Sequence, residues 1–239
     1  MIKLQNISHQ YEEKSILKNL NLTIEDNQIT CLLGSSGSGK TTILRLISGL
    51  ETVQNGILSI DKKIVSENNN LIIPPQQRNI GFVFQDLALW PHFSIYKNIA
   101  FGLEEKKELS KIEIKKTVLN ILDFFKLQEH QNKYPHQLSG GQQQLVAIAR
   151  SLVLKPKILL MDEPLANLDV KLKRKILAYI KNIKEQFDIN IIYVTHDHRE
   201  AFSMADTIIV LNQGKIEAQG SIDEIKNSTN EFVQYFLEY

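Results

Sequence analysis

The chain of 239 residues has a single cysteine, almost no net charge and no long apolar run. One cysteine, Cys31, excludes a disulfide framework and fits a reducing compartment. The 28 basic and 27 acidic residues give a formal net charge of +1, so there is no electrostatic reason to expect a nucleic-acid partner. No stretch approaches the ~20 apolar residues of a membrane span, and residues 1–5 do not resemble a signal peptide. We therefore expect a cytosolic protein, which is compatible with docking on a membrane protein.

One glycine-rich segment matches the phosphate-binding loop pattern G-x-x-x-x-G-K-S/T. It consists of Gly34, Ser35, Ser36, Gly37, Ser38, Gly39, Lys40 and Thr41. An apolar run at 29–33 predicts a buried strand before it, and the run from Thr42 to Gly49 predicts a helix after it. Glycines let backbone N–H groups curl around an anion, and the helix adds the positive end of its dipole. Lys40 can pair with the β- and γ-phosphates and Thr41 can bind Mg²⁺, so the segment predicts a nucleotide site rather than a flexible turn.

Two acidic residues directly follow a second apolar run, at 158–161. That run predicts a buried strand, and acids at its end are costly unless they have a function. Asp162 is placed to hold Mg²⁺, and Glu163 is placed to polarise a nucleophilic water. A chance pair of surface acids is the weaker alternative.

Three further polar or aromatic residues are candidates for the same site. Gln85 follows a predicted strand at 79–84, where it could reach Mg²⁺ or the attacking water, although a terminal glutamine is usually a solvated amide. His196 closes a predicted strand at 190–195 and can hydrogen-bond a γ-phosphate. Tyr11 lies in a predicted polar turn, and we weigh an adenine-stacking role and a packing role equally.

A mainly helical block extends from Ile95 to about Lys155 and contains a second glycine pair. Ser110 and Glu113 form a capping-box pattern within it. The segment 138–142 precedes a predicted helix at 143–154, and Ser139 is a good N-cap. Two glycines there allow close approach to an anion at a helix N-terminus. Since the first loop already wraps one triphosphate, this second cradle makes sense if it serves the nucleotide of another subunit.

The remaining segments predict a mixed α/β chain. We expect strands at 2–7, 20–24, 56–60, 207–211 and 215–218, a polar loop at 66–70, and a short helix from Asn230. A basic amphipathic helix is expected at 170–187, and its lysines are better explained as a solvated face than as a nucleic-acid patch.

Together these motifs resemble the ATP-binding subunit of ATP-binding cassette (ABC) transporters over nearly the whole chain. The match consists of the phosphate loop, Gln85, the Leu-Ser-Gly-Gly-Gln signature at 138–142, the segment 158–163, Asp169 and His196, in the family's order. The resemblance implies one α/β domain over residues 1–239 with the P-loop NTPase fold. It implies a RecA-like core with a mainly parallel sheet, an N-terminal antiparallel β subdomain and an inserted α-helical signature subdomain at roughly 86–155.

The resemblance also implies roles for individual residues. Glu163, His196 and Gln85 would be catalytic, and Thr41, Gln85 and Asp162 would hold Mg²⁺. The remaining contacts to ATP would come from Tyr11, the phosphate loop, Thr42, Ser139, Gly140, Gly141, Gln142 and Asp169. A head-to-tail homodimer would sandwich two ATP molecules, with each phosphate loop facing the other subunit's Ser139 segment.

Four segments resemble importers of the ferric-iron, polyamine, sulfate and sugar group. They are residues 75–78, 84–92, 167–173 and 222–225. The resemblance implies a peripheral ATPase on the cytoplasmic face of the membrane. It would associate with permease subunits and an external solute-binding protein, and ferric iron or a related small solute would be the cargo.

Two departures from the family and two rival functions qualify this interpretation. Leu145 stands where the family usually has Arg, and the chain stops at Tyr239 without the C-terminal regulatory β-domain of many members, so we do not expect regulation through such a domain. An ATPase of DNA repair would insert a long coiled coil before the signature, and no sustained heptads occur there. An exporter ATPase is less compatible with residues 85–92.

An apolar cluster follows Gln85 and is the candidate docking surface for a permease. It consists of Leu87, Leu89, Trp90, Phe93 and Ile95. Apolar side chains outside a core usually mark an interaction surface. The alternative is that the cluster anchors the helical block to the core.

Overall fold

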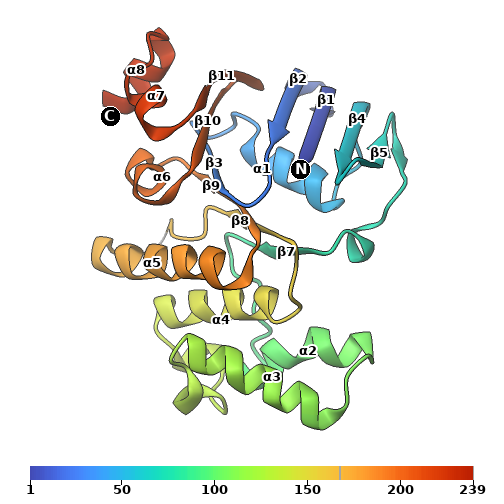
Figure 1. The fold of residues 1–239 in the computed structure, drawn as a ribbon, viewed down its shortest axis with the longest axis vertical. Coiled ribbons are helices and arrows are strands. Elements are labelled where there is room, and N and C mark those ends of the chain that lie inside the picture. Colours follow the sequence, from blue (N-terminus) through green and yellow to red (C-terminus); the bar gives the residue numbers. More distant parts are fainter. Residues whose placement is uncertain (167, 239) are drawn as a thin grey trace.

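The structure is a computed structural model that describes residues 1–166 and 168–238. Asn167, which contributed to the importer resemblance, and Tyr239 lie outside the described residues. The described chain forms two sheets and a helical region, arranged as shown in Figure 1. None of the described helices combines the length and apolarity needed to cross a bilayer.

The smaller sheet is antiparallel and comes mainly from the N-terminal part of the chain. Its strand order is β2-β1-β4-β5-β6. The strands are β1 (Ile2–Tyr11), β2 (Lys14–Ile24), β4 (Asn55–Ile60), β5 (Lys63–Glu67) and β6 (Asn70–Leu71). Alternate residues of β1 and β2 are buried, which is the pattern of strands with one solvated face.

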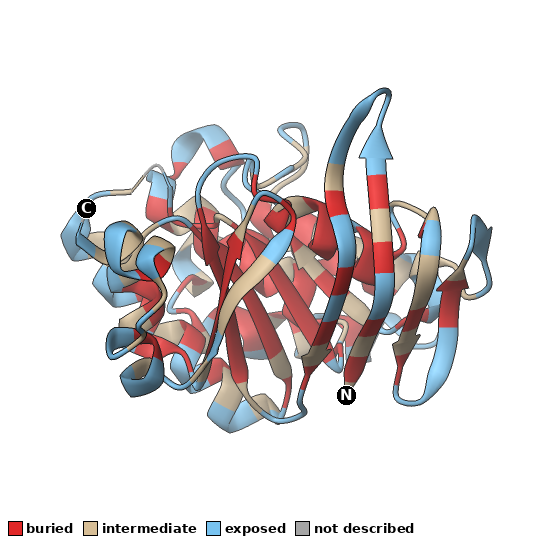
Figure 2. Ribbon diagram, turned by 90° about the horizontal axis from the view of Figure 1, so that it is seen from above, coloured by how far each residue is buried: buried red, intermediate tan, exposed pale blue. Residues whose placement is uncertain are grey.

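The larger sheet has the order β11-β10-β3-β9-β8-β7 and is parallel except for the edge strand β11. Its strands are β3 (Ile29–Gly34), β7 (Ile80–Val83), β8 (Ile158–Asp162), β9 (Asn190–Thr195), β10 (Thr207–Asn212) and β11 (Lys215–Gly220). Every residue of β3 and β8 is buried, because both faces of the sheet are covered. Figure 2 shows these central strands as buried, whereas the tip of the β1–β2 hairpin is exposed.

The helices divide between the two faces of the larger sheet. They are α1 (Lys40–Ser48), α2 (Ile95–Lys106), α3 (Lys111–Phe124), α4 (Gly140–Leu152), α5 (Val170–Phe187), α6 (His198–Met204), α7 (Ile222–Lys226) and α8 (Glu231–Glu238). One core lies between this sheet, α1 and the antiparallel sheet, and includes Leu32. The other core lies between the opposite face and the helices α2 to α5, and includes Cys31 and Leu33. Successive residues of β3 therefore serve different cores.

Several predicted elements are confirmed. Helix α5 and strand β9 occupy the predicted ranges. Ser110 and Glu113 form the expected capping box at the start of α3. Ser139 is the N-cap of α4, although this helix begins at Gly140 rather than at the predicted residue 143.

Other predictions about the N-terminal strands were wrong in their boundaries. Tyr11 is the last residue of β1, because it pairs with Lys14 of β2, and it is therefore not in a turn. The predicted loop at 66–70 is largely strand, because β5 and β6 pair across a turn at Asn68 and Asn69, both with positive φ.

The apolar cluster after Gln85 is not a single exposed surface. Ile95 is completely buried in the core, which contradicts the prediction that it lines a docking groove. Leu87 and Leu89 are half-buried and pack against the same core. Only Trp90 and Phe93 form a half-exposed aromatic cluster, together with Phe101 of α2.

Candidate functional site

The site is built where neighbouring parallel strands end. Strand β9 lies between β3 and β8, and all three run in the same direction. Their carboxyl ends therefore meet at one edge of the sheet, which is where open α/β sheets bind ligands. The phosphate loop follows β3, Glu163 follows β8, and His196 follows β9.

The phosphate loop is folded around the ammonium group of its own lysine. Gly39 has φ +105°, and a Cβ atom there would lie 2.6 Å from Leu17, so only glycine fits at this position. Lys40 is almost fully buried, and its Nζ donates hydrogen bonds of 2.8 Å to the carbonyl oxygens of Gly34 and Ser35. Burial lowers the pKa of Lys40, and nearby carboxylates oppose this shift.

The loop also fits a bound phosphate group. Among the described residues, the buried Ser38 Oγ is one of the few side-chain atoms without a hydrogen-bond partner. A Cβ atom at Gly37 would meet no atom within 4 Å, so the loop has open space beside its backbone. A buried unpaired donor next to open space is what an anion would satisfy.

Two of the three predicted Mg²⁺ ligands are in direct contact. Thr41 Oγ1 donates a hydrogen bond of 2.9 Å to Asp162 Oδ1, although the two residues are far apart in the sequence. Burial raises the pKa of Asp162, and the Thr41 hydrogen bond partly offsets this. Gln85, the third candidate, is exposed and lines the same cavity as Thr41. A hydroxyl, an amide and a carboxylate are oxygen ligands of the kind that Mg²⁺ takes alongside phosphate oxygens.

Two of the three predicted catalytic residues, Glu163 and His196, are also in contact. His196 Nδ1 lies 3.1 Å from Glu163 Oε2. Glu163 has φ +42°, an uncommon conformation for a residue with a side chain, and its N–H donates to Val194 O at 3.1 Å. The backbone therefore leaves the sheet sharply at Glu163.

Tyr11 lies beside the phosphate loop and is 40% exposed. Its hydroxyl donates to Glu51, which also contacts His9 and Arg45. Burial raises the pKa of Tyr11, and the hydrogen bond to Glu51 adds to this. The sequence analysis did not identify Glu51, because its position after α1 carries no motif.

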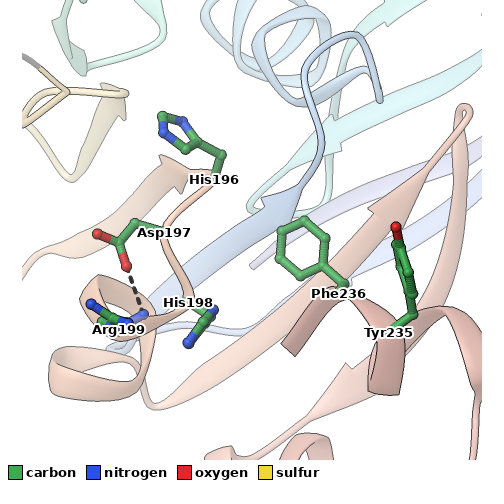
Figure 3. Close-up of a pocket in the computed structure, with 6 residues that line it drawn as sticks. All are labelled: His196, Asp197, His198, Arg199, Tyr235 and Phe236. Atoms are coloured by element: carbon green, nitrogen blue, oxygen red, sulfur yellow. Dashed lines mark hydrogen bonds between the residues drawn. The ribbon is translucent and has the colours of Figure 1, made fainter. Parts of the chain in front are cut away.

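One cavity of about 370 Å³ brings most of these residues together. Its walls are Tyr11, Ile16, Ser36, Gly37, Gly39, Lys40, Thr41, Thr42, Arg45, Gln85 and Glu163. A larger cavity of about 490 Å³ is lined by His196, by the start of α6, and by Tyr235 and Phe236 of α8 (Figure 3). No phosphate-loop residue lines that larger cavity, so the smaller one is the candidate nucleotide site.

The signature segment lies elsewhere on the chain. Among the described residues that line the nucleotide cavity, none belongs to 139–142. A Cβ atom at Gly141 would lie 2.5 Å from Leu172 of α5, so this segment packs against the helix that Asp169 caps. Gln142 accepts the N–H of Ser139 at the start of α4, and its amide nitrogen lies 2.8 Å from His130 Nε2, a residue that belongs to no motif in the sequence. At the departure from the family pattern, Leu145 is buried among apolar side chains.

A protein-family model described as ABC transporter matches residues 17–166. The chain belongs to the ABC transporter family. This confirms the resemblance inferred from the motifs.

Two curated relatives are named as ATP-binding proteins of spermidine/putrescine import. The chain is 44% identical over 238 residues to the spermidine/putrescine import ATP-binding protein PotA of Vibrio cholerae, covering 99% of this chain and 62% of that protein. It is 44% identical over 239 residues to the protein of the same name from Clostridium acetobutylicum, covering 99% of this chain and 66% of that protein. The chain thus spans less than two thirds of the length of these relatives.

Solved structures show the same fold. A dimeric bacterial ABC transporter cassette superposes with a TM-score of 0.82 at 35% identity, covering 93% of this chain and 99% of that one. A dimeric cassette in a post-hydrolysis state bound to ADP and Pi gives a TM-score of 0.80 at 34% identity, with the same coverage. The predicted ABC fold, with an antiparallel β subdomain beside a mainly parallel sheet, is confirmed.

Proposed function

We propose that this ABC chain is the ATP-hydrolysing subunit of an import system, and that the imported solute is a polyamine. The observation that supports hydrolysis is a single cavity that joins the phosphate loop to Gln85 and Glu163. The names of the relatives support polyamine import, and none of those reported above is named for ferric iron, the solute suggested from the sequence. We further propose that residues 1–239 form one ATP-binding domain with a helical subdomain at about 86–155.

In this proposal the phosphate loop binds ATP by exchanging hydrogen bonds within the loop for hydrogen bonds to the phosphates. The Lys40 ammonium leaves the carbonyl oxygens of Gly34 and Ser35 and pairs with phosphate oxygens, and Ser38 Oγ gains a partner. Thr41, Gln85 and Asp162 would hold Mg²⁺, which would neutralise charge on the phosphates. Tyr11 stacks on the adenine ring.

The chemical step depends on Glu163 and His196. Glu163 takes a proton from the attacking water as the water oxygen bonds to the γ-phosphorus and the bond from that phosphorus to ADP breaks. His196, which contacts Glu163 at 3.1 Å, holds this carboxylate and the γ-phosphate in place. A general base must lie within hydrogen-bond reach of its proton, and the sharp backbone turn at Glu163 directs the side chain into the cavity.

The proposed assembly has three kinds of partner. A second copy supplies Ser139, Gly140, Gly141, Gln142 and Asp169 to the nucleotide, because no described residue of 139–142 lines the chain's own cavity. Membrane permease subunits hold the chain peripherally at the cytoplasmic face, and an external solute-binding protein delivers the polyamine.

Two measurements test this function. The purified chain should release phosphate from ATP in a reaction that needs Mg²⁺, and Lys40→Ala should abolish it, because the buried ammonium is the cation of the loop. Cells lacking this chain should lose uptake of radiolabelled spermidine but not of ferric iron, and the wild-type gene but not the Lys40→Ala gene should restore it. Normal spermidine uptake in the deletion strain would contradict the polyamine assignment, and absence of phosphate release would contradict the enzyme assignment.

A further inference from the structure

A buried carboxylate that the proposed reaction does not use lies behind the His196 turn. Glu200, on the first turn of α6, is only 5% exposed. Burying a carboxylate is costly unless hydrogen bonds and an opposite charge compensate it. Its partners therefore indicate what it holds in place.

Both carboxylate oxygens of Glu200 are used. Oε2 accepts hydrogen bonds from Tyr193 Oη at 2.7 Å and from Thr195 Oγ1 at 2.9 Å. Oε1 lies 2.7 Å from the ammonium of Lys173, which also approaches Asp197 at 3.5 Å. Burial raises the pKa of Tyr193 well above its usual value, so this hydroxyl stays a donor.

These contacts fix the backbone on both sides of His196. Thr195 Oγ1, which donates to Glu200, accepts the N–H of Asp197 at 3.0 Å. The Asp197 carboxylate in turn caps α6 by accepting the N–H of Arg199 at 2.9 Å, the bond drawn in Figure 3. His196 thus lies between two residues that depend directly or indirectly on one carboxylate.

Through its ion pair with Lys173, the Glu200 carboxylate also contacts helix α5. Lys173 is on the first turn of α5, and its N–H donates to the carbonyl oxygen of Asp169 at 2.9 Å. Asp169 is the N-cap of α5 and a predicted contact to the shared nucleotide. An ion pair between the partly exposed Lys173 and the buried Glu200 therefore joins the start of α5 to the His196 turn.

We propose that Glu200 is a positioning residue that holds His196 for hydrolysis and couples its turn to the start of α5. This inference rests on the proposed ATPase function and deepens it. When a second copy contacts Asp169, a shift of the first turn of α5 is transmitted through Lys173 and Glu200 to His196. Glu200 itself touches neither the nucleotide cavity nor any residue of the phosphate loop in the described contacts.

The decisive experiment is a double-mutant cycle with His196. Glu200→Gln should lower kcat by about 10- to 100-fold, the range expected for a misplaced catalytic group. The KM for ATP should change by less than about twofold, because the phosphate loop is untouched. In a His196→Ala background the same substitution should cause no further loss, measured in single-turnover assays that resolve low rates.

Companion variants separate positioning from stability. Lys173→Met should resemble Glu200→Gln, whereas Lys173→Arg should restore most of the activity, because it keeps the charge. Ser66→Ala, which removes a buried hydroxyl from the other sheet, should lower the melting temperature without changing kcat. If Glu200→Gln fails to fold, Thr195→Val provides the smaller perturbation for the same cycle.

The outcomes distinguish the two proposals. If the wild-type chain hydrolyses ATP but the effects of Glu200→Gln and His196→Ala multiply, the positioning role is wrong and the ATPase function stands. An unchanged kcat in Glu200→Gln would likewise contradict the positioning role and leave the ATPase function standing. Absence of hydrolysis by the wild-type chain would instead overturn the proposed function.

Discussion

At the scale of single residues, the candidate site contains two buried charges whose partners are incomplete. Burial lowers the pKa of Lys40 and raises that of Asp162, so in both cases the surroundings favour the neutral form. Lys40 has two carbonyl oxygens as partners, and Asp162 has the Thr41 hydroxyl. An anion beside Lys40 and a cation beside Asp162 would relieve both penalties.

Glu163→Gln is the sharpest test of the chemistry at this scale. The amide cannot take a proton from water, so turnover should fall by about 10²–10⁴-fold, the usual effect of removing a general base. ATP binding, followed with a fluorescent nucleotide, should persist, because the phosphate loop is unchanged. Near-normal steady-state hydrolysis by this variant would remove Glu163 from the role of base.

Tyr11 allows a second test, with a matched control. Tyr11→Ala should weaken ATP binding by about 1–3 kcal/mol, the usual value of stacking on one base, and GTP binding should weaken similarly because every base has a π-face. Tyr11→Phe keeps the ring and loses only the hydrogen bond to Glu51, so it should bind ATP more tightly than Tyr11→Ala does. Equal affinities in the wild type and Tyr11→Ala would return Tyr11 to a packing role.

At the scale of elements, sequence periodicity identified long segments better than short ones. The eighteen residues of α5 carry a complete apolar stripe, which places Ile176, Ile180 and Ile183 in the core, and its range was predicted correctly. Helices α6 and α7 have seven and five residues, too few for such a stripe, and were missed. The extension of β1 to Tyr11 depends on pairing with β2, which a local pattern does not contain.

The segment 86–94 is the predicted contact with the permease, and it can be tested as a unit. Its backbone is pinned by the buried Asn98 of α2, whose amide donates to the carbonyl oxygens of Trp90, Phe93 and Ser94 at 3.1 Å. Trp90 also packs under the guanidinium group of Arg150, 5.0 Å from the ring centroid. A half-exposed aromatic on a pinned loop is suited to contact a partner.

Replacing Leu89 and Trp90 by serine should abolish association with the permease and leave the ATPase activity of the isolated chain intact. Association is measured by co-purification from membranes. As a control, Asn98→Ala should lower the free energy of unfolding by about 1–3 kcal/mol, the cost of leaving buried carbonyl groups unpaired, and the melting temperature should fall with it. If the Leu89 and Trp90 variant loses stability to the same extent, or still co-purifies, these side chains serve the core.

At the scale of the whole molecule, the sequence predicted that motifs far apart in the chain come together, but it did not predict all of the contacts among them. The order of motifs places Lys40, Glu163 and His196 at the ends of strands, and parallel topology then brings them to one edge. The Thr41–Asp162 and His196–Glu163 contacts follow from that edge. Glu51, His130 and Glu200 were not found, because none of them belongs to a motif and their contacts form only in the folded chain.

Complementation between two inactive variants tests the dimer. Lys40→Ala and Ser139→Ala should each be nearly inactive alone. An equimolar mixture should regain about a quarter of the wild-type rate per chain, because half of the two-fold dimers are mixed and each mixed dimer has one intact site. Mixing Lys40→Ala with the double variant Lys40→Ala/Ser139→Ala is the control and should restore nothing. A rate per chain that stays constant on dilution to monomers would contradict the shared site.

The position of β3 in its sheet has a consequence for how the chain is made. Both neighbours of this strand, β9 and β10, come from the last quarter of the sequence, with Ile29 opposite Ile191 and Thr30 opposite Thr207. During synthesis at 5–20 residues per second, β3 therefore waits about 8–30 s before its first partner leaves the ribosome. Throughout that time both edges of this apolar strand lack the partners that they have in the folded sheet, and unpaired edges of this kind favour aggregation. The cassette acquires its phosphate loop early and its folded core only near the end of translation.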